Sequence, residues 1–313
     1  MLNIEKVKLA IIGGSGLYDM EALTDVKEFK IKTPFGDPSD AIVVGSLSSQ
    51  RVAFLPRHGR GHRLTPTEVN SRANIWALKS IGVERIVSVS ACGSLREEFE
   101  PRHIVIPSQL FDRISGRPLT FFGNGIVAHI GLADPFCPEL SGLLYEAVKN
   151  TGATVHMGGW FVTIEGPRFS TKAESTLFRQ WGMDIIGMTA IPEANLAREA
   201  EICYACMAHV TDYDVWHAGE ETVNVQMIIE RLLANVEVSK RAIAYLAPAI
   251  PNRRTCECPT ALANAIITQP QFVPLKTKRD LAPIIGKYMP IAATKAAKKV
   301  VKKKLPRRRV TRG

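Results

Sequence analysis

Short apolar runs recur along the first 210 residues of this chain, and longer amphipathic stretches separate them. Some runs end in glycines, as expected of buried strands that lead into tight turns. The intervening stretches place apolar residues three and four positions apart, which is typical of helices. Strands are expected around 8–12, 28–32, 41–45, 52–55, 85–90, 103–107, 154–156, 160–164, 184–187 and 202–207, and helices around 65–82, 138–150, 171–180, 192–199 and 223–245. This alternation predicts an α/β fold with a mixed, twisted sheet and helices on both faces.

Local signals mark two of these helices and one long connection. Thr65-Pro66-Thr67-Glu68 predicts a helix start with Thr65 as the N-cap, and Ser170 is an equivalent N-cap further on. Residues 108–137 are rich in Gly and Pro and have no clear period. An irregular connection of this length usually serves function or an interface.

Small or polar residues follow four of the expected strands. They occupy Gly13–Gly16, Arg57–His62, Ser90–Ser94 and Met188-Thr189. Backbone amides, hydroxyls and Arg or His donors of this kind suit an anion. Individually, these stretches also suit a plain glycine turn or a basic surface loop, but the strand ends of such a sheet meet at one edge. We therefore expect one anion site there.

The run Ile202–Met207 leads into Asp212 and Asp214, which strand alternation places on the same side. On its own, an Asp-x-Asp after a strand indicates a solvated turn. At the ligand-binding edge of an α/β sheet, it also suits the recognition of a substrate.

Charge is unevenly distributed. The chain has 313 residues and a formal charge of +10, but residues 281–313 hold 11 Lys and Arg and no acidic residue, which leaves 29 basic and 30 acidic residues elsewhere. The first residues lack the plan of a signal peptide, and no apolar run reaches the roughly 18 residues of a transmembrane helix. A cytoplasmic protein without a membrane span is expected.

The six cysteines leave their chemistry open. Cys203 and Cys206 lie in an apolar strand pattern, where a thiol acts as a small apolar group. Cys256-Glu257-Cys258 suits a strained disulfide or half of a metal site, but no neighbouring Cys or His pair completes four zinc ligands. No metal site is expected.

Seven motifs in order now support a resemblance. They include Gly-Gly-Ser-Gly-Leu, Arg-His-Gly-Arg-x-His, Ala-Cys-Gly-Ser-Leu-Arg-Glu-Glu, Glu-Gly-Pro-Arg-Phe-Ser and Thr-Asp-Tyr-Asp. Over about residues 7–250 the chain resembles the purine nucleoside phosphorylase family. The resemblance implies the nucleoside phosphorylase fold in residues 1–250 and a C-terminal extension over 251–280 with a segment that caps the active site. It also implies a homotrimer or homohexamer. The last segment resembles no part of this family, and the Lys, Arg and Ala content of residues 281–313 predicts a flexible basic tail.

The resemblance further implies the phosphate-dependent cleavage of S-methyl-5′-thioadenosine to adenine and 5-methylthioribose 1-phosphate, as in purine and methionine salvage. A 6-oxopurine nucleoside or methylthioinosine phosphorylase is the alternative. Phosphate is a co-substrate, and neither a cofactor nor a metal is expected. The phosphate-binding residues implied are Ser15, Arg57, His58, Ser90, Ala91 and Thr189. The substrate-binding residues implied are Met188, Phe169, Ser170, Asp212, Asp214, Val225, His62 and, from a neighbouring subunit, His129.

In the expected mechanism, phosphate held by Arg57 and His58 attacks the sugar while a protonated Asp212 donates to purine N7. Burial and the Asp214 carboxylate would raise the pKa of Asp212. An acidic pair at the base favours a 6-amino over a 6-oxo purine.

The C-terminal region carries two further expectations. Its basic tail gives a rival class of function, a nucleic-acid-binding role through 281–313, against a merely solubilising extension. Some heat-stable members of the family carry Cys-x-Cys and internal disulfides, and Cys137, Cys203, Cys206, Cys256 and Cys258 occupy compatible places; a cytoplasmic protein would keep free thiols.

Overall fold

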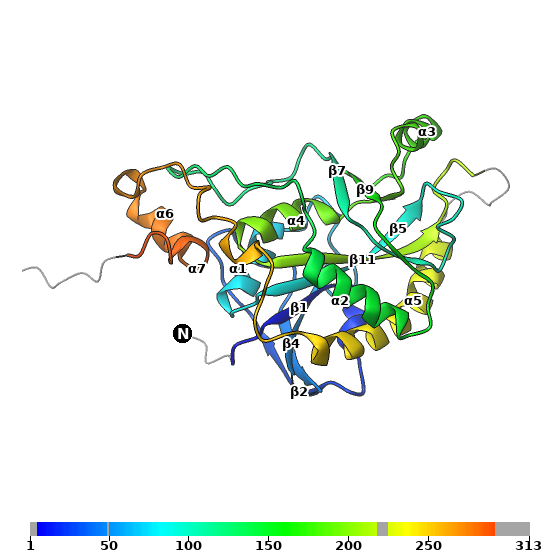
Figure 1. Cartoon of the computed structure of the whole chain (residues 1–313), viewed down its shortest axis with the longest axis horizontal. Helices are drawn as coiled ribbons and strands as arrows, with labels where there is room; N and C mark the ends of the chain where they lie inside the picture. The colour runs from blue at the N-terminus through cyan, green and yellow to red at the C-terminus, as the bar shows by residue number, and fades with distance from the viewer. Residues whose placement is uncertain (1–4, 49, 218–224, 292–313) are drawn as a thin grey trace, which may run out of the picture.

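The computed structural model describes residues 5–48, 50–217 and 225–291, except for the side chains of Ser15, Tyr18 and residues 225–234. Within these ranges the chain forms one mixed sheet with helices packed on both faces (Figure 1). The expected α/β fold is confirmed. The strands are β1 Leu9–Gly13, β2 Thr24–Phe29, β3 Ile42–Leu47, β4 Gln50–Pro56, β5 Arg85–Ser94, β6 Ile104–Ile106, β7 Gln109–Arg113, β8 Val155–Met157, β9 Trp160–Ile164, β10 Ile185–Gly187 and β11 Cys203–Asp212.

Four parallel strands form the centre of the sheet. β1 pairs in parallel with β4 on one side and with β5 on the other, and β11 pairs in parallel with β5. Their carboxyl ends therefore lie along the same edge, as the sequence pattern predicts. β5 is long enough to pair with β1 and β11 along its length and with β10 at its end. The sheet thus divides near the end of β5.

Alternation along these strands supplies a core to each face. In β1, Leu9 and Ile11 pack into one apolar cluster, while Ala10 and Ile12 pack into the other. The helices over these clusters are α1 Ser71–Ser80, α2 Pro138–Lys149, α4 Ala190–Glu199 and α5 Val225–Ala249. α2 and α5 pack together over one face, and α1 and α4 over the other (Figure 1). α3 Lys172–Gln180 lies at the periphery, next to the divided end of the sheet.

The segment that follows α5 packs back onto the body. It contains the short turns η2 Cys258–Thr260 and η3 Pro270–Phe272 and the helices α6 Leu275–Asp280 and α7 Ala282–Ile285. The side chains of Leu281, Ile284 and Ile285 are buried, and the Trp76 indole donates to the Asp280 carbonyl over 2.7 Å. A flexible tail beginning at residue 281 is therefore wrong for residues 281–291, because their apolar side chains complete the core beside α1. Residues 292–313, which carry most of the basic tail, lie outside the described residues.

Among the described helices, none combines the length and the apolar character needed to cross a bilayer.

Candidate active site

A cavity of about 610 Å³ opens where the carboxyl ends of the parallel strands meet. Its walls come from segments far apart in the sequence: the loops after β1 and β4, the second half of β5, the connections that follow β9 and β10, the end of β11, and one side of α5. A cavity of this size at this edge is the usual form of a small-molecule site in an α/β protein.

The structure brings most of the residues expected at the site into this one cavity. Its lining includes Arg57, His58, His62, Ser90, Ala91, Phe169, Ser170, Met188, Thr189, Asp212 and Asp214. The side chains of Ser15 and Val225 are not described, although Gly14, next to Ser15, does line the cavity. His129 does not line the cavity of its own chain. It is exposed, and its amide donates to the Ala265 carbonyl over 2.9 Å. Within the described residues, nothing beyond Ser239 reaches the lining, so the 251–280 extension does not cap the cavity of its own chain.

Two hydroxyl groups lie close together at the end of the cavity where phosphate is expected to bind. Ser90 comes from β5, and Thr189 precedes α4. Their oxygen atoms are 2.7 Å apart, so one hydroxyl donates to the other. The Ala91 amide is the next backbone group along the strand. The sequence predicted that separate loops carry Ser90, Ala91 and Thr189. In the structure, Ser90 and Ala91 lie within β5 and Thr189 lies at the start of α4, so regular elements rather than flexible loops hold these groups in place.

Arg57 is buried among protein acceptors. Its Nε donates to Glu193 Oε1 over 2.6 Å and its Nη2 to Glu193 Oε2 over 3.1 Å. Nη2 also donates to Ser88 Oγ, and Nη1 donates to the Val89 carbonyl. Burial opposes the charge of Arg57, but Glu193 outweighs burial and raises the pKa of the guanidinium. The Nε–Nη2 edge of the guanidinium, which could donate two hydrogen bonds to phosphate, therefore binds Glu193 instead. At most one N–H group, on Nη1, is left for a ligand.

His58 is fixed in one tautomer. Its Nδ1 lies 2.9 Å from the Leu64 carbonyl oxygen, which can only accept, so Nδ1 carries the hydrogen. Burial and the neighbouring Arg57 charge lower the pKa of His58 to about 4. At neutral pH, Nε2 is therefore an acceptor. The His62 ring stacks on His58 with ring centroids 4.4 Å apart.

The acidic pair lies at the end of β11, and its two members differ. Asp212 accepts from the Thr211 hydroxyl over 2.7 Å and from the Asp214 amide over 2.8 Å. The Oδ2 atom of Asp214 is buried and has no hydrogen-bond partner among the described atoms. Burial and, secondarily, the Asp212 charge raise the pKa of Asp214. The structure thus gives a raised pKa to Asp214, whereas the acid role expected of Asp212 stays a prediction.

A further wall of the cavity contains Phe169 and Ser170, which lie in the connection between β9 and α3. Ser170 Oγ is buried and has no partner among the described atoms, and the Phe169 ring is partly exposed. Arg117, from the long 108–137 connection, stabilises this wall through bonds to the carbonyl groups of Met188 and Glu165. Part of this irregular connection therefore orders the cavity.

Several functional candidates are missing from the sequence-based set. Glu193 pairs with Arg57, and Arg117 donates to the Met188 carbonyl. The other three line the cavity: His209, Asn235 and Ser239. His209 is fully buried, its Nε2 lies 2.8 Å from Ser239 Oγ, and burial lowers its pKa to about 4. The only sequence signals were that His209 and Glu193 stand in apolar stretches. Such a signal does not show which residue each side chain contacts.

The only group of His, Cys, Asp or Glu compact enough for a metal ion, within the described residues, lies outside this cavity. It comprises Cys137, Cys203, Cys256 and Cys258. The expectation that no pair completes four ligands around Cys256 and Cys258 is wrong, because the fold brings in two cysteines that are distant in sequence.

Comparison with known proteins gives this cavity a family. Residues 8–248 match the model of the phosphorylase superfamily. The chain belongs to the phosphorylase superfamily. This match spans the four central strands and α1 to α5, so the cavity lies within the region shared by the superfamily.

Relatives cover nearly the whole chain. The S-methyl-5′-thioadenosine phosphorylase of Geobacter sulfurreducens is 55% identical over 90% of this chain and 99% of its own length. The enzyme of the same name from Koribacter versatilis is 53% identical over 90% and 97%. A crystal structure of a methylthioadenosine phosphorylase from an antarctic soil metagenomic library superposes with a TM-score of 0.86, at 48% identity over 90% and 99% of the two chains. The fold is therefore that of the phosphorylase superfamily, and the chain is a pentosyltransferase of this superfamily.

Proposed function

We propose that this protein cleaves S-methyl-5′-thioadenosine by phosphorolysis. The observation that carries the proposal is one cavity that joins a hydroxyl and imidazole cluster, suited to phosphate, to a pair of carboxyl groups, suited to a purine. The names of relatives that are more than half identical over nine-tenths of the chain support the same substrate.

The reaction transfers a pentosyl group. A phosphate oxygen forms a bond to C1′ as the C1′–N9 bond breaks, and adenine leaves with a proton on its ring. The products are adenine and 5-methylthioribose 1-phosphate. Inorganic phosphate is the co-substrate, and the reaction as proposed uses no cofactor.

Phosphate would bind where Ser90, Ala91, Thr189 and His58 meet. The two hydroxyl groups and the Ala91 amide would donate to its oxygens. His58 Nε2 would accept the hydrogen of a monoprotonated phosphate, because its pKa of about 4 keeps the ring neutral. Arg57 would contribute its charge and one Nη1 hydrogen, since Glu193 occupies its other side. Ser15, as inferred from the resemblance, would complete this site.

The purine would lie between Phe169 and the acidic pair. One carboxyl of the pair would donate to N7 and stabilise the leaving base, and the other would accept from the 6-amino group. Asp212 is the expected donor, and the raised pKa of Asp214 makes it the competing candidate. The apolar lining includes Leu17, Pro66 and Val236, which suits a methylthio group better than a charged one. Met188 would lie against the ribose, and Val225 would extend the apolar wall.

We infer a trimer or hexamer in which His62 and, from a neighbouring subunit, His129 close the phosphate and methylthio ends of the site. The exposed position of His129, outside its own cavity, supports this arrangement. Light scattering after size exclusion should give three or six chains per particle; a monomer with full activity would contradict it.

A substrate panel tests the proposal. Methylthioadenosine, methylthioinosine, adenosine and inosine should be compared at saturating phosphate. The highest kcat/KM is expected for methylthioadenosine. Preference for either 6-oxo nucleoside would replace the proposal by the 6-oxopurine alternative. Removing residues 292–313 should leave these rates unchanged, and DNA binding lost on that removal would assign a separate role to the tail.

A further inference from the structure

Four of the six cysteines gather at the end of the molecule opposite the cavity. Cys137 precedes α2, Cys203 begins β11, and Cys256 and Cys258 follow α5. Their four sulfur atoms all lie within 4.8 Å of one another. Cys203 and Asp212 stand at opposite ends of β11, so the cluster lies roughly 30 Å from the acidic pair at about 3.3 Å per residue. The cysteine cluster, defined as these four residues, is thus separate from the proposed reaction.

We propose that the cysteine cluster binds one structural Zn²⁺ ion in a tetrahedral site. Four mutually close sulfur atoms are what a tetrahedron requires, whereas two disulfides need only two close pairs. With Zn–S bonds of about 2.3 Å, tetrahedral sulfur atoms lie about 3.8 Å apart. The Sγ atoms of Cys203 and Cys256 are 3.4 Å apart, and no pair in the cluster exceeds 4.8 Å. Small side-chain rotations would therefore complete the site.

The ligands are held on rigid parts of the fold. The Cys137 amide donates to the Tyr204 carbonyl over 2.8 Å, and the Cys203 amide to the Glu84 carbonyl over 3.0 Å. The first bond fixes the start of α2 against the start of β11, and the second fixes the start of β11 against the residue that precedes β5. Three of the four cysteines are buried and Cys256 is partly exposed, so the site is shielded but has an entry path.

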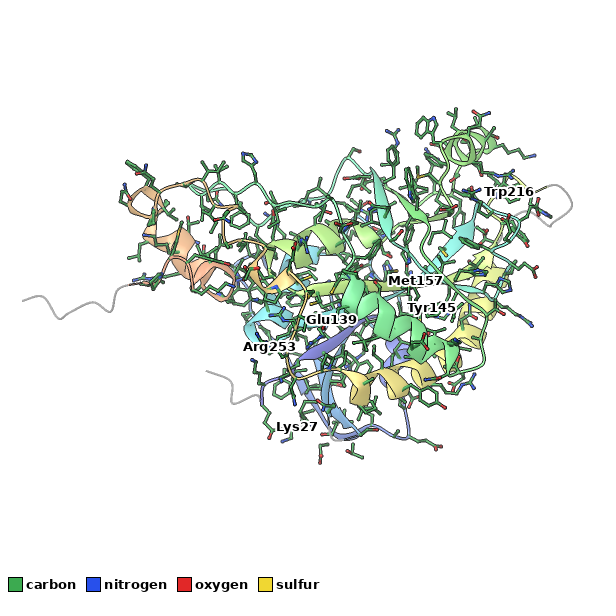
Figure 2. All side chains as sticks on the ribbon, viewed as in Figure 1. Lys27, Glu139, Tyr145, Met157, Trp216 and Arg253 are labelled. Carbon is green, nitrogen blue, oxygen red and sulfur yellow. The ribbon has the colours of Figure 1, made fainter. Side chains whose placement is uncertain are left out.

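Glu139 positions the Cys256–Cys258 segment. Its Oε2 accepts from the Thr255 amide over 2.8 Å, from the Thr255 hydroxyl over 2.6 Å and from the Cys256 amide over 3.1 Å. Figure 2 shows Glu139 at the start of α2, facing the segment that carries Arg253. Arg254 adds bonds to the carbonyl groups of Glu84 and Glu201. The Cys-x-Cys turn is therefore held in place before any ion binds.

Nearby groups also offset negative charge. Zinc with four thiolates carries two net negative charges once four protons are released to solvent. Arg198 Nη1 donates to Cys258 Sγ over 3.4 Å. Cys137 occupies the N-cap of the 12-residue helix α2, where the helix dipole favours a thiolate. Groups that hydrogen-bond to the ligand atoms in this way are typical of metal sites in proteins.

The ion would attach the segment after α5 to the sheet. Cys258 packs in the core beside α2, and Leu262 packs in the core of the other face. Zinc would thereby anchor residues 251–291 to β11, and its binding free energy would add to folding stability.

Metal analysis of the full-length chain, with any tag removed and without chelators, tests this inference. We expect one zinc per chain by mass spectrometry of the metals, released stoichiometrically when a mercurial modifies the thiols. Exchange with Co²⁺ should give the intense visible bands of a tetrahedral thiolate site and a sulfur-to-cobalt charge-transfer band. Metal-free protein, four cysteines paired as disulfides under native conditions, or stoichiometric iron in place of zinc would each overturn the proposal.

Variants localise the ion. Cys256→Ser should lower the zinc content to near zero, and Cys256→His should restore it, because imidazole also binds zinc. Cys206→Ala is the matched control: Cys206 lies on the same strand as Cys203 but outside the cluster, and its variant should keep one zinc. Full zinc in Cys256→Ser, or its loss in Cys206→Ala with a native circular dichroism spectrum, would refute the assignment.

Discussion

Arg57→Met should destabilise the protein strongly, because it leaves the Glu193 carboxylate without its charged partner. The two side chains are 4% and 1% exposed, and two bonds of 2.6 and 3.1 Å join them. Removing one partner of a buried ion pair typically costs about 3–5 kcal/mol. At roughly 2 °C per kcal/mol for a chain of this size, the Tm should fall by about 6–10 °C.

The double variant Arg57→Met/Glu193→Gln separates stability from phosphate binding. Without either charge, most of the penalty disappears, so the Tm should recover by at least half of the loss. Activity should not recover, since the Nη1 hydrogen and the positive charge at the phosphate end are both absent. Arg60→Met is the control, because Arg60 lies in the same loop but pairs with Glu28 at the surface; its Tm should stay within about 2 °C of wild type.

Thermal unfolding at one scan rate and the KM for phosphate are the two assays. If Arg57→Met keeps the wild-type Tm and only raises the KM for phosphate, Arg57 is a free phosphate ligand and its pairing with Glu193 carries no stability. A double variant no more stable than Arg57→Met would equally refute the reasoning.

Three further predictions concern single groups. His58→Ala should lower kcat/KM for phosphate by about 10- to 100-fold, as expected for the loss of a hydrogen bond to a charged group, with a much smaller effect on the KM of the nucleoside in initial-rate assays; equal effects on both would contradict the assignment. Asp212→Asn and Asp214→Asn should differ: the variant of the proton donor should lose about 10²–10⁴-fold in kcat for adenine release, and if neither loses more than tenfold the pair is not the acid. His209 has a pKa near 4 in the folded protein against 6.5 ordinarily, so its contribution to stability is present above pH 6.5 and is lost as the pH falls toward 4. His209→Gln should therefore reduce the loss of stability between pH 7 and pH 5 by about 2 kcal/mol in denaturant unfolding, and an unchanged pH profile would show that His209 takes up no proton on unfolding.

Periodicity was sufficient to predict the edge of the sheet where the cavity lies. The apolar run before Asp212 indicated a buried strand, and the small residues after β1 and around Ser90 indicated backbone amides and hydroxyls suited to an anion. These are local signals, and parallel pairing then brings the ends of the strands together. The expected strand was too short, because β11 continues through His209 and Thr211 to Asp212. His209 and Thr211 are polar although the whole strand is buried, so they interrupted the apolar run from which the length of the strand was predicted.

Two helices begin at a different residue from the one that the sequence predicts. Thr65 and Glu68 make the bonds expected of a capping box, but the turn they form is isolated. Helix α1 begins at Ser71, with Asn70 as its N-cap. Thr171, rather than Ser170, caps α3, because Glu174 at the third position completes its capping box. The displaced Ser170 faces the cavity instead.

Contacts between distant residues were beyond the reach of the sequence pattern. Glu193 lies 136 positions from Arg57, and an Arg in a Gly-spaced loop gave no sign that its charge is satisfied inside the protein. The cysteine cluster unites three segments for the same reason: pairing of β11 with β5 and the return of the chain after α5 determine which sulfur atoms meet.

The central claim is most directly tested by the phosphate dependence of adenine release from S-methyl-5′-thioadenosine. Purified full-length protein should release adenine only when phosphate is present, with one equivalent of 5-methylthioribose 1-phosphate formed per adenine. Adenine release at the same rate without phosphate, with free methylthioribose as the sugar product, would make the protein a hydrolase and contradict the account.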